Sequence, residues 1–100
     1  MSSRLGAKFA PAFSRDLKRK AGRRGWDLRD LEEVVALVME NSPESLETLR
    51  RRHGMHRLSG QWGGSSECHV ANAGDWLVVW RVEDDVAYFQ RTGSHDELFR

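Results

Sequence analysis

The four histidines of this chain are its clearest candidates for chemistry, and three of them stand in distinctive surroundings. His56 begins the run HRLSGQW, His69 lies in ECHV, and His95 follows RTGS. An imidazole is the side chain best suited to proton transfer near neutral pH. We therefore take His56, His69 and His95 as candidate acids or bases, with a hydrogen-bonded structural role as the alternative for each.

The segment RTGSHDELFR places Arg91, His95 and Phe99 four residues apart. Four-residue steps put side chains on one face of a helix. Arg91 could hold a phosphate or stabilise charge that develops on one, and Phe99 could line a ligand site or plug the core. Because Gly93 interrupts the segment, convergence of these side chains through a turn fits the spacing as well as one continuous helix does.

The dipeptide Asp75-Trp76 adds a carboxylate and an aromatic ring to the candidates. Asp75 could orient a histidine or act as a base. Trp76 and Phe99 offer ring faces on which nucleic-acid bases stack, although Trp62, Trp76 and Trp80 are also explained as core residues.

Several chemistries lack their motifs here: the chain has no P-loop, no G-x-S-x-G and no pair of catalytic carboxylates. His53-x-x-His56 has the spacing of metal ligands, but the neighbours Cys68 and His69 would point to opposite faces of a predicted strand. We therefore predict no metal and no cofactor. The chemistry that remains is phosphoryl transfer in RNA, which needs a base for the 2′-OH, an acid for the leaving 5′-oxygen and a cation near the phosphorus.

The net charge of +1 hides a strongly basic start, since the first 25 residues hold eight Lys/Arg and one acid, Asp16. Such a segment indicates an anionic partner, either nucleic acid or an acidic protein, or else a solvated helix face. The candidate contacts to substrate are Arg15, Lys18, Arg19 and Arg23.

One hundred residues predict a single domain, residues 1–100. We expect an α+β fold in which an αα-hairpin packs on a small antiparallel sheet and a short helix or turn closes the chain. The expected helical elements are a helix from Ser14 that Gly22 and Gly25 end, a helix capped by Asp27 that Asn41-Ser42-Pro43 ends, and one or two helical turns at 45–52. The expected strands are a weak one at 4–10 and others at 67–70, 75–82 and 86–91, with a turn at 83–85 and a closing segment at 92–99.

Cys68 is the only cysteine, which excludes an intrachain disulfide and favours a reducing compartment. The start MSSRLGAKFA lacks the apolar stretch of a signal peptide, and the longest apolar run, VVALVM, is too short to cross a bilayer. We expect a cytoplasmic protein without a membrane partner.

Taken together, HRLSGQW, ECHV, DWLVVW and RTGSHDELF resemble the YafQ branch of the RelE-type toxins, and FSRDLKRKAGRRGWDLRDLEEVV matches the opening pattern of that family. The resemblance covers roughly residues 8–99. It implies a RelE-like fold and an mRNA interferase of a type II toxin–antitoxin system. Such an enzyme cleaves mRNA in the ribosomal A site by 2′-OH attack, without metal.

The resemblance also implies partners and residue roles. The partners are mRNA, the ribosome with its rRNA, and a small cognate antitoxin that binds the toxin monomer in a hetero-oligomeric complex. His95 would lead proton transfer and Arg91 would stabilise the phosphate. Asp75, His56 and His69 would assist as a base or hold the scissile phosphate, while Trp76 and Phe99 would shape the nucleotide pocket.

The chain departs from the family pattern in one place: the family has three residues, commonly including a proline, between the histidine of ECHV and the Asp-Trp pair. Here there are five, Val70-Ala71-Asn72-Ala73-Gly74, and no proline. This longer turn puts the position of Asp75 in question. Two alternatives stay open. One is a module that only binds nucleic acid, which would not require His56, His69 and His95. The other is a degenerate toxin that only binds its antitoxin, which the longer turn favours.

Overall fold

The computed structural model describes residues 4–24, 26–70 and 75–99, with the side chains of residues 20–24 left out of the description. The elements follow in the order β1 (Gly6–Phe9), α1 (Pro11–Arg24), α2 (Leu28–Glu40), α3 (Pro43–His53), β2 (His56–Arg57), the 3-10 turn η1 (Gly60–Trp62), β3 (Ser65–His69), β4 (Leu77–Glu83), β5 (Val86–Gly93) and α4 (His95–Phe99). The predicted α+β class is confirmed.

The five strands form one sheet in the order β1-β5-β4-β3-β2. β2, β3, β4 and β5 pair antiparallel, as expected. β1 pairs parallel with β5, so the sheet is mixed rather than purely antiparallel. The difference arises because the weak strand at the start of the chain adds to the outer edge of the last hairpin, a pairing between distant segments that local sequence does not encode.

The helices begin and end where capping residues allow. Asp27 caps α2 by accepting the backbone N–H of Arg29, as predicted. α1 begins at Pro11 and not at Ser14, since proline suits the first turn of a helix, where its missing N–H would be unpaired. Pro43 likewise opens α3 behind the N-cap Ser42, so the expected one or two turns are an 11-residue helix.

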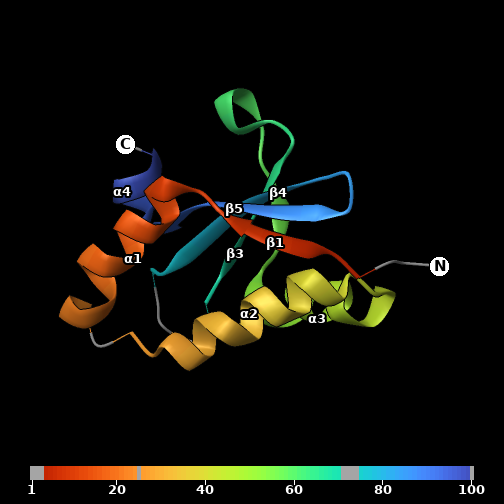
Figure 1. The fold of residues 1–100 in the computed structure, drawn as a ribbon, viewed down its shortest axis with the longest axis horizontal. Coiled ribbons are helices and arrows are strands. Elements are labelled where there is room, and N and C mark those ends of the chain that lie inside the picture. Colours follow the sequence, from red (N-terminus) through yellow and green to blue (C-terminus); the bar gives the residue numbers. More distant parts are fainter. Residues whose placement is uncertain (1–3, 25, 71–74, 100) are drawn as a thin grey trace.

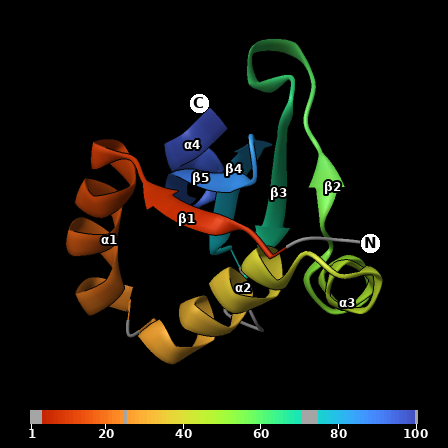
Figure 2. The same ribbon diagram turned by 45° about the vertical axis from the view of Figure 1, so that its right-hand side comes forward.

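α1, α2 and α3 lie at the edge and on one side of the sheet (Figures 1 and 2). α1 packs along β5, while α2 and α3 pack together. Side chains of α1, α2 and α3 enclose the main core with the sheet, including Phe13, Val34, Leu49, Trp76 and Phe89.

The opposite face of the sheet carries a second, smaller apolar cluster. Leu77 and Val79 of β4 are buried there beneath Leu98 of α4, with Leu58, Trp62 and Phe99 packed around them. α4 therefore covers this face of the sheet near β5. Within the described ranges no helix is long and apolar enough to cross a membrane.

Candidate active site

The register of the sheet brings two of the candidate residues, His56 and Arg91, to one face. His56 is paired with Glu67, Glu67 with Val79, and Val79 with Arg91. Directly paired residues project from the same face of a sheet. Arg91 therefore emerges on the side of His56, in a row that crosses four strands.

The next row on the same face is His69, Leu77 and Gly93. Since alternate residues of a strand share a face, His69 lies on the side of Glu67. Gly93 ends β5 at a φ of 154°, a backbone conformation that favours glycine, and His95 begins α4 two residues later. A turn, rather than one helix, thus brings His95 to this face.

His95 is held by Asp75. The Oδ1 atom of Asp75 accepts a hydrogen bond from Nδ1 of the His95 ring at 2.8 Å and from its backbone N–H at 3.0 Å. A carboxylate only accepts, so the ring carries its proton on Nδ1 and leaves Nε2 as the atom that can exchange a proton. The five-residue connection thus leaves Asp75 in contact with His95, although residues 71–74 themselves lie outside the described part of the chain.

Aromatic rings surround His95. The ring centroid of His69 lies 6.1 Å from that of His95, and the ring centroid of Phe99 lies 6.2 Å from that of His95. Phe99 also meets Trp62 edge-to-face at 5.7 Å. Phe99 thus belongs both to the smaller apolar cluster and to the surroundings of His95, which joins the two interpretations of its position.

His56 has a carboxylate partner that sequence analysis missed. Its Nε2 lies 3.5 Å from Oε1 of the buried Glu67, and its Nδ1 lies 3.1 Å from the carbonyl oxygen of Gly54. A Cβ added to Gly54 would stand 3.5 Å from the His69 ring, so this glycine lies between the two histidines. The available signal was the Glu of ECHV, two residues before His69 and hence on its face.

His53 is not placed as a metal ligand beside His56. It is buried, and its Nδ1 donates a hydrogen bond to the carbonyl oxygen of His69 at 2.9 Å. Its Nε2 has no partner among the described residues. The described residues contain no group of three or more His, Cys, Asp or Glu side chains that could hold a metal ion.

Arg91 is tied to Asp16 of α1. Its Nε donates to Oδ2 of Asp16 at 2.7 Å and its Nη2 donates to Oδ1 at 3.1 Å. These bonds raise the pKa of Arg91 above its ordinary value, and its side chain stays 31% exposed. Sequence analysis had noted Asp16 only as the single acid among eight bases.

Trp76 does not have the position expected of a base-stacking platform. It is 0% exposed, stacks on Trp26 with ring centroids 4.4 Å apart, and donates from Nε1 to Oγ1 of Thr92 at 2.8 Å. The expected direct contact of Trp76 with a nucleotide is therefore wrong, because the ring lies in the core and is hydrogen-bonded to Thr92 of β5.

The basic residues of α1 approach the site through Arg91. Arg15, Lys18 and Arg19 line a cleft of about 450 Å³ together with Asp16 and Arg91. The side chain of Arg23, the fourth expected contact, lies outside the described residues. α1 therefore extends the positive surface outward from Arg91.

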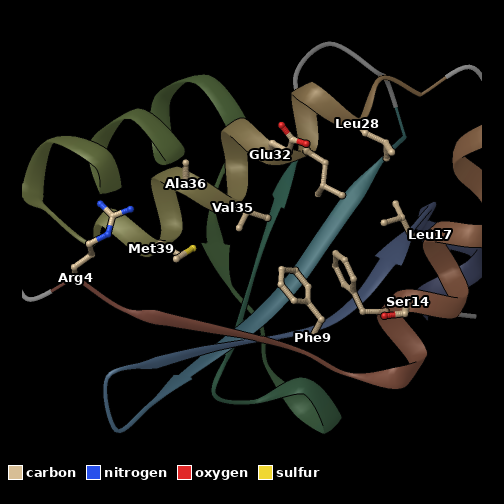
Figure 3. Close-up of a pocket in the computed structure, with 11 residues that line it drawn as sticks. Arg4, Phe9, Ser14, Leu17, Leu28, Glu32, Val35, Ala36 and Met39 are labelled. Atoms are coloured by element: carbon tan, nitrogen blue, oxygen red, sulfur yellow. The ribbon is translucent and has the colours of Figure 1, made fainter.

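A separate groove of about 530 Å³ lies between α1, α2 and β1 (Figure 3). Its lining is mostly apolar, with Phe9, Leu17, Leu28 and Val35 directed into the space and Arg4 at one end. Leu28 is 46% exposed, which is high for a leucine in a folded domain.

Comparisons with known proteins identify the family of this chain. Residues 5–100 match the family described as bacterial toxin of type II toxin-antitoxin system, YafQ. The mRNA interferase toxin YafQ of Escherichia coli K12 is 29% identical over 92 residues, which cover 92% of each chain.

Solved structures of similar proteins include YafQ from E. coli BL21(DE3), with a TM-score of 0.80 and 27% identity over 96% of this chain and 99% of that one. The E. coli DinJ–YafQ toxin–antitoxin complex gives a TM-score of 0.77 with 26% identity, covering 98% and 100% of the chains. A metal-bound toxin from Helicobacter pylori gives 0.79 with 30% identity, covering 95% and 99%.

Proposed function

Because this chain belongs to the YafQ family of type II toxins, we propose that it is an mRNA interferase that cleaves mRNA in the ribosomal A site. The observation that carries the proposal is the Asp75–His95 pair beside His69, on the sheet face from which Arg91 emerges. We also propose that residues 1–100 act as one domain in the cytoplasm, where mRNA is translated.

In the proposed reaction the 2′-oxygen of a ribose forms a bond to the adjacent phosphorus and the bond from phosphorus to the 5′-oxygen breaks. The 2′-OH proton passes to one imidazole, and another imidazole donates a proton to the leaving 5′-oxygen. The products are a 2′,3′-cyclic phosphate and a 5′-hydroxyl. General acid and base groups contribute about 10²–10⁴-fold each to reactions of this kind.

His95 leads proton transfer because Asp75 fixes its tautomer and directs exchange to Nε2. His69 and His56 supply the second proton-transfer group or hold the scissile phosphate. Arg91 stabilises the charge that develops on the phosphorane, since a guanidinium keeps its positive charge and offers several donors to phosphate oxygens. The Phe99 ring lines the nucleotide pocket beside His95.

These side chains supply an acid, a base and a cation, so the proposed chemical step needs no metal. The phosphates of mRNA or rRNA on the ribosome are contacted by four basic residues of α1, namely Arg15, Lys18, Arg19 and Arg23. The contact of 2.8 Å between Asp75 Oδ1 and His95 Nδ1 supports an active enzyme over a degenerate toxin. A longer turn that displaced Asp75 would have removed this contact.

We further propose that a cognate antitoxin binds this toxin through an amphipathic helix seated in the groove of Figure 3. A related toxin has been solved in complex with its antitoxin. The groove presents an apolar floor beside the basic α1, which suits a helix with one apolar face and an acidic flank. Replacing Leu28 by Glu should weaken antitoxin binding by at least tenfold. Val82, 48% exposed on β4, gives the matched control, so unchanged binding by L28E, or an equal loss in V82E, would contradict this site.

Expression in bacteria tests the function as a whole. Active protein should arrest growth and leave A-site cuts in mRNA with 2′,3′-cyclic ends, and co-expression of the antitoxin should restore growth. Normal growth with intact mRNA would exclude the active enzyme. Ribosome binding without cuts would favour the binding module instead.

A further inference from the structure

The one acidic residue in the basic start of the chain, Asp16, has a largely buried carboxylate that is bonded to Arg91 of the site. Its side chain is only 11% exposed, although Arg15 and Lys18 beside it on α1 line an open cleft. A buried carboxylate is costly unless it is paired and hydrogen-bonded. Among the described residues, Asp16 meets this requirement through β5.

Three hydrogen bonds join Asp16 to β5. Two come from Nε and Nη2 of Arg91, and the third comes from the backbone N–H of Thr92 to Oδ2 at 3.1 Å. Two donors on one edge of a guanidinium fix the plane of the group as well as its position. The remaining N–H groups are then held in a constant direction for a second anion.

Thr92 links Asp16 to β4 and to Trp76 in the core. Its hydroxyl donates to the carbonyl oxygen of Leu77 at 2.8 Å and accepts from Nε1 of Trp76. Thr92 precedes Gly93 and the turn that leads to His95. The same carboxylate therefore anchors both the arginine and the strand end from which His95 departs.

We propose that Asp16 is a positioning residue of the cleavage site: it orients the Arg91 guanidinium toward the RNA phosphate and anchors the β5 end that carries His95. This inference rests on the proposed function. It assigns the lone acid of α1 to the reaction through Arg91, and it makes α1 part of the site's framework in addition to a basic contact surface.

The test is Asp16→Asn, with Asp84→Asn as the matched control. Asp84 lies in the β4–β5 turn at a φ of 50°, which asparagine tolerates, and its replacement removes the same charge. In ribosome-dependent cleavage D16N should lose about 10–100-fold in kcat, the scale expected for a misplaced catalytic group. Its KM should stay equal or fall, because losing an anion favours RNA binding. D84N should match the wild type.

A double-mutant cycle with Arg91→Lys separates positioning from general support of the fold. If Asp16 acts through Arg91, D16N should cost little further in the R91K background. Full additivity of the two losses, or wild-type kcat in a folded D16N protein, would overturn the proposal.

A second readout does not depend on activity. In ¹⁵N-labelled wild type the Nε–H of Arg91, assigned by its loss in R91K, should exchange slowly with solvent, and D16N should make it exchange rapidly. If the wild type itself does not cleave, the proposed function fails while this measurement still decides the orientation of Arg91: retained protection in D16N would refute it. Should D16N not fold, Asp16→Glu keeps the charge and shifts the carboxylate by one methylene. Unchanged kcat and protection in that variant would likewise refute the proposal.

Discussion

A single carboxylate oxygen of Asp75 accepts two hydrogen bonds from His95, one from the ring Nδ1 and one from the backbone N–H. The first bond selects the tautomer of the imidazole and the second sets where α4 begins. The position of the ring and its chemistry are therefore coupled. A histidine at the start of a short helix would otherwise be free to turn into solvent, since its side chain is largely exposed.

Replacing His95 by Ala should reduce mRNA cleavage by about 10²–10⁴-fold, the cost of losing a proton-transfer group. Fold and antitoxin binding should remain, because the His95 side chain is not part of either apolar cluster. Single-turnover cleavage on programmed ribosomes measures the loss. Asp96→Asn, at the next exposed position of α4, serves as the control. Near-wild-type cleavage by folded H95A would show that this residue is structural.

Replacing Phe99 by Ala should affect both activity and stability. The ring packs against Trp62 and stands beside His95. We expect a loss of about 2 kcal/mol in the free energy of unfolding, below the 3–5 kcal/mol of a fully buried phenylalanine, together with at least tenfold slower cleavage. Urea unfolding and cleavage assays on one preparation give both values. A stable but inactive variant would mean that the ring acts on substrate alone.

Reversing two charges on α1, Lys18→Glu with Arg19→Glu, should weaken ribosome binding and flatten its dependence on salt. Each phosphate contact contributes to the slope of log K against log salt, so losing two should reduce the slope by about two. Arg50→Glu with Arg51→Glu on α3 makes the same change in charge elsewhere. Identical salt series for wild type and the α1 variant would return this helix to a solvated face.

Metal should not be required for the chemical step. Ribosomes need Mg²⁺, so the direct measurement is elemental analysis of purified toxin, which should contain less than one tenth of an equivalent of transition metal. The metal-bound relative from H. pylori makes this comparison worthwhile. A stoichiometric metal lost together with activity in a His53→Ala/His56→Ala double variant would contradict the prediction.

Cys68 should resist alkylation in the folded protein. Burial, with a smaller contribution from the neighbouring Glu67, raises the pKa of its thiol to about 12 from 9.0, so the reactive thiolate is scarce at pH 8. Because the thiol pKa is higher in the folded state than in the unfolded state, the thiol stabilises the folded state in full below about pH 9. This stabilisation is lost as the pH rises from about 9 toward 12. Iodoacetamide labelling should therefore require unfolding. The stability gap between wild type and Cys68→Ala should narrow above pH 9, and rapid native labelling would contradict the burial.

Local signals predicted most of the fold. The cap at Asp27 and the hairpin of 77–93 are set by residues close in sequence, and both were expected. The sequence pattern underestimates α3 because Pro43 signals the end of α2 and, at the same time, opens the next helix. The parallel pairing of β1 with β5 depends on segments about 80 residues apart, which no local pattern reports.

The candidate site divides in the same way. The types and spacing of His56, His69 and His95 marked them, and the sheet register places the first two on one face. Sequence could not show that Trp76 would be buried, since a tryptophan fits both a surface on which bases stack and a position in the core. Nor could it pair Arg91 with Asp16, because the two meet only when α1 packs along β5.

The parallel pairing of β1 with β5 has a consequence for synthesis. β1 leaves the ribosome early but gains its partner only when residues 86–89 follow it, and Arg91, His95 and Phe99 are translated later still. Loop closure across so many residues makes this pairing a late step in folding. Under the proposed function, the cleavage site of a nascent chain would therefore be complete only after β5 has left the ribosome and can pair with β1.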